Sequence, residues 1–217
     1  MISMLMGGLP LFAQTVGVDT AQDLYSPQAA GAGLFTTSAG SSAAQSLNPA
    51  SAGQAQRTVL DAGYLLLTGL GSEPGIGHAL SLGAIYPTKY AVFSGSMRLL
   101  SSPFNSFPIG TTFGLDLGVA KELYPGMTVG TGLNFGFGTD WTAALDLGFR
   151  YNMGKLLILD DFTWAVVFGG LGKSFIPSPF TLAGGVSFDY LRIPGREGKP
   201  DPLRLGLATD LALPGFM

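Results

Sequence analysis

An alternation between two kinds of side chain recurs in segment after segment of this chain and limits the folds open to it. In WTAALDLGFRYNM, residues 141–153, every second residue is apolar or aromatic, and the residues between them are small or polar. A repeat of two residues is the geometry of a β-strand, whose successive side chains point to opposite faces of a sheet. This stretch therefore predicts a strand with two unlike faces.

The same alternation predicts about nine strands. They cover residues 58–68, 77–87, 89–100, 112–121, 127–138, 141–153, 162–169, 180–190 and 203–213. Most are about ten residues long, the length that a tilted strand needs to cross a bilayer, whereas strands of soluble proteins average about 5–6 residues. The connections are tight turns such as ELYPG or Pro-rich loops, and NMGKLLILDD is predicted as a longer loop or as a loop that extends its strands. No connection holds a helix long enough to join parallel strands. The predicted fold class is therefore all-β, as an antiparallel meander.

Charge composition bears on which face of these strands meets water. Charged residues make up 12% of the chain, about half of the ~25% that is usual in soluble domains. The small-residue faces hold few Lys or Glu, so a soluble sandwich or soluble lipid-binding barrel would have a surface poorly protected against aggregation. A transmembrane barrel would turn its apolar faces to lipid and its small residues to a narrow lumen. The composition favours the transmembrane barrel, and the soluble β-protein remains the alternative.

In such a barrel, the polar residues on the small-residue faces line the lumen. They are Asp61, Asp116, Asn134, Asp146, Arg150, Asp189, Arg204 and Asp210. Asp146 and Arg150 lie about 13 Å apart along one strand face, too far for a direct ion pair. We expect each to meet a partner on a neighbouring strand or on a plug, in a structural role. Aromatic residues near strand ends are expected to form girdles at the membrane interfaces. They are Tyr64, Tyr86, Tyr90, Trp141, Tyr151 and Tyr190.

Two segments precede the strands. Residues 1–14, MISMLMGGLPLFAQ, have the length and apolar character of an export signal, although no Lys or Arg precedes the apolar run. Residues 15–57 are rich in Ala, Ser and Gly, and a short helix is predicted at Ser42–Leu47 because the Asn-Pro that follows ends it. The predicted organisation is a signal peptide at 1–14, an N-terminal plug at 15–57 and barrel strands at 58–217. No apolar run elsewhere approaches the ~18 residues of a membrane-spanning helix, which excludes a helical membrane protein.

Several kinds of chemistry are disfavoured by the residues present. The chain has no cysteine and one histidine, His78, so a thiolate site, a zinc site and a catalytic triad all lack partners. The glycine-rich stretch Gly69–Gly77 lacks the Lys-Ser/Thr of a phosphate-binding loop and is predicted as a hairpin loop. The net charge of −3 comes without a basic block, which argues against nucleic acid as a partner. We expect no enzyme activity, no metal and no cofactor.

The segment ahead of the first strand resembles a known family. GAGLFTTSAGSSAAQSLNPASAG resembles the N-terminal segment of FadL/PorV-type outer-membrane proteins, in which a Gly-rich stretch and an Ala-rich helix lead to Asn-Pro-Ala before the first strand. Here that motif is Asn48, Pro49 and Ala50. LDLGFRYNMG is similar to the family's recurrent Asp-Leu-Gly strand, and WAVVFGGLGKSF with PFTLAGGVSFDYL is similar to the strand pair that follows. Within the family, the chain resembles the poorly characterised FadL-like proteins of spirochaetes.

The resemblance implies a bacterial outer-membrane barrel with a plug in its lumen, which takes up long-chain fatty acids or other hydrophobic molecules. PorV-type relatives imply the alternative, a non-transporting scaffold or accessory barrel in protein export. The chain departs from the family at Gly40 and Ser41, where an acidic pair is common. No role is therefore carried over to that loop.

The number of strands conflicts with a closed barrel of this family. Bacterial single-chain barrels have an even number of strands, and the resemblance implies fourteen, whereas the alternation predicts nine. An open edge in lipid leaves a row of unpaired amides, each costing several kcal/mol. We therefore expect an incomplete barrel, with closure by fewer strands or pairing with another chain as alternatives.

Overall fold

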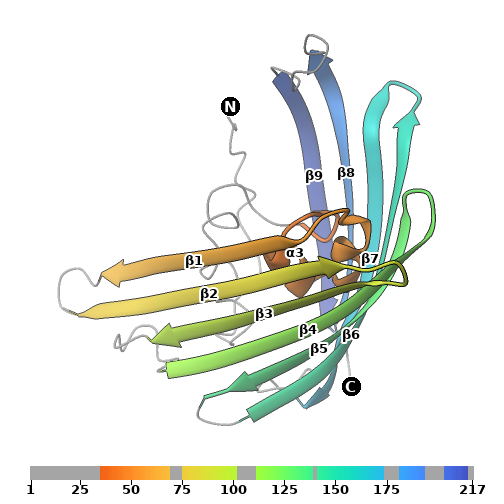
Figure 1. Cartoon of the computed structure of the whole chain (residues 1–217). Helices are drawn as coiled ribbons and strands as arrows, with labels where there is room; N and C mark the ends of the chain where they lie inside the picture. Colours follow the sequence, from red (N-terminus) through yellow and green to blue (C-terminus); the bar gives the residue numbers. More distant parts are fainter. Residues whose placement is uncertain are drawn as a thin grey trace.

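A computed structural model of the chain describes residues 35–68, 75–101, 111–138, 141–173, 181–193 and 203–214. Within these residues the fold is one antiparallel sheet whose nine strands follow one another in chain order (Figure 1). The strands are β1 (Val59–Thr68), β2 (Ile76–Pro87), β3 (Val92–Ser101), β4 (Thr111–Tyr124), β5 (Met127–Phe137), β6 (Trp141–Leu156), β7 (Leu159–Lys173), β8 (Thr181–Ile193) and β9 (Leu203–Pro214). The predicted all-β antiparallel meander of nine strands is confirmed. The predicted signal peptide and residues 15–34 lie outside the described residues.

The turns follow the chemistry of their residues. Strands β4 and β5 are joined by Pro125 and Gly126, where Gly126 has φ +82° and its amide donates to Glu122 Oε1 at 2.7 Å. A positive φ costs glycine little because it has no Cβ. Strands β6 and β7 continue to Leu156 and from Leu159, so residues 152–161 extend the two strands around a two-residue turn. Of the two predictions for that stretch, the strand extension is confirmed and the longer loop is wrong.

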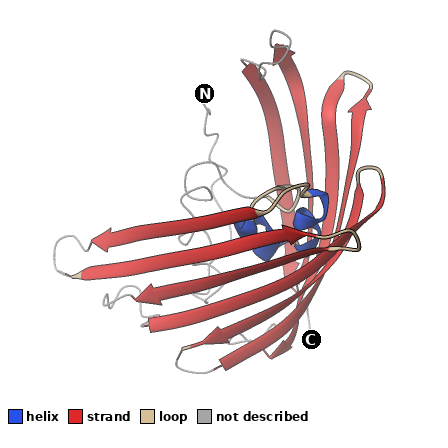
Figure 2. Cartoon of the chain, viewed as in Figure 1, coloured by secondary structure: helices blue, strands red, loops and turns tan. Residues whose placement is uncertain are grey.

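The sheet is curved, and two short helices lie on its concave side (Figure 2). Helix α3 (Ser42–Leu47) contacts β1, β2 and β3, and the 3₁₀ helix η2 (Pro49–Gln54) contacts β3 to β6. Among the described strands, β1 and β9 do not pair with each other, so the sheet is open at both edges. The described part of the predicted plug segment, residues 35–57, thus lies inside an open trough.

Local sequence explains where these helices begin and end. The Ser41 hydroxyl accepts a hydrogen bond from the Ala44 amide at 3.1 Å, which caps the first turn of α3. Asn48 is extended, ends α3 and caps η2, and Pro49 occupies the first turn of η2, where its missing N–H costs nothing. The predicted helix at Ser42–Leu47 is confirmed.

Large apolar side chains lie on the convex side of the sheet and are exposed. Every strand contributes at least two of them. They include Leu60, Tyr64, Leu66, Ile76, Leu82, Tyr86, Phe93, Met97, Leu99, Leu117, Val119, Leu133, Phe137, Trp141, Leu147, Met153, Phe168, Leu171, Tyr190, Leu191, Leu207, Leu211 and Leu213. On the concave side, a small apolar cluster of Ala52, Ile85, Val92 and Ala120 packs at the η2 end of the trough. The larger apolar surface is therefore outside, and the buried polar and charged side chains are inside.

Candidate functional site

The Asn-Pro-Ala motif lies at the centre of the concave face. The Asn48 side chain is fully buried, and its Nδ2 donates to the Thr36 carbonyl at 2.8 Å and to the Phe149 carbonyl of β6 at 3.3 Å. Its Oδ1 accepts from the Ala50 amide at 2.9 Å. One side-chain amide thus joins the start of η2, an upstream turn and the wall, so each of these polar groups has a partner inside the trough.

Glycines of the wall let the motif approach the sheet closely. A Cβ built at Gly130 of β5 would lie 2.6 Å from the Ala50 amide nitrogen, and one at Gly148 of β6 would lie 2.9 Å from the same atom and overlap Asn48 Oδ1. Real side chains do not reach such distances without displacing a neighbour. The plug backbone therefore packs directly against the small-residue face of the strands.

Arg150 of β6 ties the plug to the middle of the wall. It is 7% exposed, its Nε donates to the Thr37 carbonyl at 2.9 Å, and its Nη1 donates to Gln54 Oε1 at 2.6 Å. Both acceptors belong to the plug: Thr37 precedes α3, and Gln54 is the last residue of η2. A buried guanidinium is costly unless its donors are used, and here it holds the two ends of the described plug segment to one strand.

Asp210 of β9 holds the turn at which that segment begins. Residues 35–38 form a turn in which the Ser38 amide donates to the Phe35 carbonyl and the Phe35 amide donates to the Ser38 hydroxyl. The Thr36 amide and hydroxyl donate to the two Asp210 carboxylate oxygens at 2.7 and 3.0 Å. Asp210, Arg150 and Asn48 therefore converge on the buried Thr36–Thr37 pair.

Asp61 of β1 makes a matching contact with the plug from the opposite edge strand of the sheet. Its Oδ2 accepts from the Ser42 amide at 2.9 Å, at the first residue of α3. This amide has no acceptor within the helix, because the first four N–H groups of a helix are unpaired. The carboxylate supplies that acceptor and also lies at the positive end of the helix dipole.

Three more of the predicted lumen residues, Asp116, Asn134 and Asp146, pair within the wall. Asp116 of β4 is fully buried, and its carboxylate accepts from Arg98 Nη2 and from the Ser96 hydroxyl of β3, each at 2.7 Å. Asp146 of β6 accepts from Asn134 Nδ2 of β5 and from the Gly170 amide of β7, the latter at 2.8 Å. Asp146 and Arg150 thus meet separate partners, on neighbouring strands and on the plug respectively.

Two predicted residues lie apart from these contacts. Asp189 is on β8, opposite Asp160 of β7 and Gly206 of β9 in the register. Arg204 is on β9, opposite Arg192 of β8 in the register, and its side chain lies outside the described part of the structure.

Several residues of the site have no predicted role in the sequence. They include Thr36, Thr37, Gln54, Ser96, Arg98, Phe149 and Gly170. For Arg98 a signal existed, since it is a cation in the strand next to the acidic Asp116. Thr37 contributes a backbone carbonyl, which no side-chain pattern can reveal.

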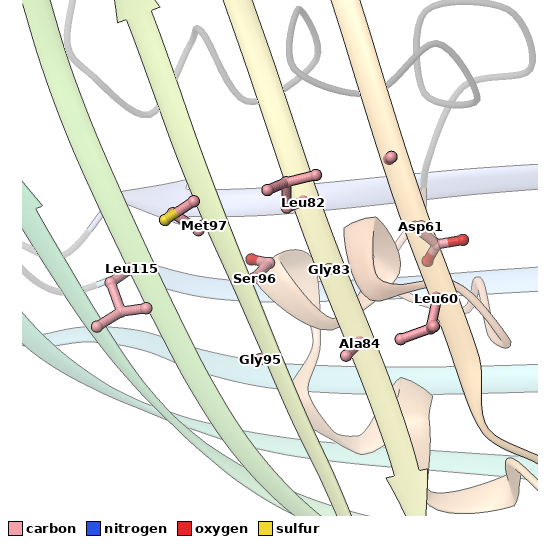
Figure 3. Close-up of a pocket in the computed structure, with 10 residues that line it drawn as sticks. Leu60, Asp61, Leu82, Gly83, Ala84, Gly95, Ser96, Met97 and Leu115 are labelled. Atoms are coloured by element: carbon pink, nitrogen blue, oxygen red, sulfur yellow. The ribbon is translucent and has the colours of Figure 1, made fainter.

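The convex face carries a shallow depression of about 450 Å³ over β1 to β4 (Figure 3). The small residues Ala62, Ala84 and Gly95 form its base. Larger apolar residues border it, namely Leu60, Leu82, Met97 and Leu115. His78 lies on the same face near the start of β2, where Nδ1 is 2.7 Å from the Tyr64 hydroxyl and the two rings stack. The depression is apolar, and it lies on the side of the sheet opposite the plug.

Comparison of the chain with family models, with curated proteins and with solved structures finds no match. Among the described residues, no His, Cys, Asp and Glu side chains gather in a group of three or more that could hold a metal ion. No helix in the same residues is long and apolar enough to cross a membrane.

Proposed function

We propose that this chain forms a plug-bearing wall of a bacterial outer-membrane β-barrel of the FadL/PorV type, and that the barrel takes up long-chain fatty acids or other hydrophobic molecules. One observation carries the membrane part of this proposal. Large apolar side chains are exposed on the convex face of all nine strands, while Asp116, Asp146 and Arg150 are buried on the concave face. A soluble protein has the reverse arrangement, with its apolar face covered by a second layer.

The extent of the apolar face makes a water-exposed surface a poor explanation. Nine strands about 4.8 Å apart and about ten residues of ~3.3 Å long cover roughly 1,200 Å² or more. The largest apolar patch of an ordinary soluble monomer is about 300–600 Å². Lipid would remove the free-energy cost of exposing this apolar area to water, because the wall then faces a medium as apolar as its leucines.

The two ends of the strands also fit a membrane wall. Tyr86, Tyr90 and Tyr124 lie exposed at the end where tight turns join β2 to β3 and β4 to β5. Trp141 and Phe137 lie exposed at the opposite end, whereas Tyr64 lies in the middle of β1. Aromatic residues at both rims of an apolar band are typical of outer-membrane barrels, and the tight turns would lie on the periplasmic side.

Strand direction limits how such a wall can be completed. In an antiparallel sheet of nine strands, β1 and β9 run in the same direction. Antiparallel pairing at both free edges then needs an odd number of further strands, whether from additional residues of a longer polypeptide or from another chain. The total becomes even, as in bacterial single-chain barrels. A second copy in the same orientation would instead create parallel seams.

Uptake tests the proposed function. Outer-membrane vesicles from cells that produce the chain should accumulate labelled long-chain fatty acid faster than vesicles from cells that lack it. Equal accumulation in the two would reject transport. Because its edges are open, the isolated chain should give no steady single-pore conductance in planar bilayers and no heat-modifiable band on gels. A stable closed pore would reject the incomplete wall.

A scaffold without transport is the second candidate, and the plug contacts favour it. Asp61, Arg150 and Asp210 hold the plug segment from β1, β6 and β9 at once, which suits a fixed support better than a gate. Such a protein would leave fatty acid accumulation unchanged. Its loss would instead reduce the amount of an exported protein at the cell surface. The soluble lipid-binding alternative predicts that the purified chain stays dispersed without detergent.

A further inference from the structure

The two edge strands of the sheet are each held by a carboxylate that faces inward. Asp61 lies on β1 and Asp210 lies on β9, at opposite ends of the strand order. Each accepts a backbone N–H from the same short stretch of the plug. Asp61 takes the amide of Ser42 at 2.9 Å, and Asp210 takes the amide of Thr36 at 2.7 Å.

The stretch between the two anchors is short. Ser42 follows Thr36 by six residues, so even a fully extended chain would separate the two amides by only about 20 Å. Without a connection, the edges of an open sheet are free to move apart or together, since β1 and β9 share no ladder. This stretch therefore sets an upper limit on the opening between them.

Further contacts keep the stretch from sliding. Thr36 also donates its hydroxyl to Asp210 at 3.0 Å, and a Cβ at Gly185 of β8 would overlap both groups, so Thr36 sits directly over β8 and β9. Asn48 and Arg150 donate hydrogen bonds to the adjacent carbonyls of Thr36 and Thr37, at 2.8 and 2.9 Å. The stretch cannot shift by one residue without breaking both bonds. The turn is thus fixed to β6 as well as to β9.

We propose that residues 36–42 act as a brace, which ties the two free edges of the sheet together across its concave side and fixes the opening between them. The brace rests on the contacts of Asp61 and Asp210 and does not depend on transport. It presents β1 and β9 at a preset separation to whatever strands complete the wall. It also means that the plug segment cannot leave the trough as a unit unless at least one edge is released.

Distances between spin labels test the brace directly, and the absence of cysteine in the chain gives a clean background. Labels are attached to cysteines at Leu60 and Leu211, which are exposed on β1 and β9 beside the two anchors. In the full chain in detergent, we expect a narrow distance distribution. Asp61→Ala and Asp210→Ala, singly and together, should broaden it at least twofold.

A second label pair and a control variant keep the outcome interpretable. Labels at Met97 on β3 and Leu147 on β6 report the interior of the sheet, and their distribution should stay unchanged in every variant. Thr209→Val alters β9 beside the anchor, at a position whose side chain points away from the plug, and should leave both pairs unchanged. An edge distance that keeps its width in the double variant would overturn the brace. Equal broadening of both pairs would also overturn it, because the carboxylates would then hold the whole sheet rather than its edges.

Discussion

At the scale of single residues, Arg150 shows how the inner face is stabilised. It is buried, and its guanidinium donates hydrogen bonds to the neutral oxygens of Thr37 and Gln54. The sequence predicts that Arg150 has a partner beyond its own strand, because Asp146 is too far along that strand. The identity of the partners lies beyond sequence reasoning, since a carbonyl oxygen is common to every residue and only the path of the chain brings Thr37 to this place.

Replacing Arg150 by methionine should destabilise the folded chain. The change leaves the Thr37 carbonyl and Gln54 Oε1 without a donor inside the trough, and each unpaired buried acceptor costs about 1–3 kcal/mol. Relief of the buried charge offsets part of this cost, so we expect a net loss of about 2 kcal/mol. The measurement is urea unfolding in detergent, followed by the fluorescence of Trp141 and Trp164.

The matched control for this variant is Lys155→Met, which removes a cation from the exposed end of the same strand. It should change the free energy of unfolding by less than about 0.5 kcal/mol, as surface substitutions usually do. If Arg150→Met were as mild as Lys155→Met, the contacts of the guanidinium with the plug would contribute nothing to stability.

At the scale of elements, the strands were predictable because one alternation encodes both their conformation and their two faces. The predicted segments match all nine strands, and the differences lie at the ends, where β4, β6 and β7 continue past the apolar repeat. There the ladder continues through residues such as Lys155 and Leu156, whose composition gives no periodic signal. The helix at Ser42–Leu47 was equally predictable, because Asn48 and Pro49 can only end it.

The seating of η2 against the wall gives a prediction for the glycine face. Gly148→Ala should push the Asn-Pro-Ala motif off the sheet, because the new Cβ would overlap Asn48 Oδ1, and such overpacking costs about 1–3 kcal/mol. A loosened η2 exposes the segment that follows it, which includes the exposed Arg57. We therefore expect trypsin to cleave after Arg57 several times faster in this variant.

Gly184→Ala on β8 provides the comparison, because the nearest atom to its added Cβ is the Ala165 carbonyl oxygen at 3.5 Å, an ordinary contact. Its cleavage rate should equal that of the parent chain. Identical rates for both variants would show that the close approach at Gly148 is not needed to seat the motif.

At the scale of the whole molecule, the strand count was predictable, whereas the curvature and the opening were not. Curvature depends on the register of every ladder and on contacts such as Asp61 with Ser42 and Asp210 with Thr36. These join residues far apart in the chain, and no local pattern links them. The sequence expectation of an incomplete barrel agrees with an open sheet, and what completes the wall remains part of the proposed function.

In the proposed function the convex face of this sheet meets lipid, and labels along strand β6 can measure this directly. Single nitroxide labels placed one at a time between 141 and 153, leaving out positions 146, 148 and 150 because their residues contact the plug or the neighbouring strands, report collision rates with oxygen and with a water-soluble nickel chelate in the full chain reconstituted in vesicles. The odd-numbered positions, which include Trp141, Leu147 and Met153, should collide often with oxygen and rarely with the chelate. Even-numbered positions such as Thr142 and Ala144 should be shielded from oxygen. Oxygen collision rates that alternate along the strand, high at odd-numbered and low at even-numbered positions, support a lipid-facing wall. Frequent collision of the odd-numbered positions with the chelate would contradict it.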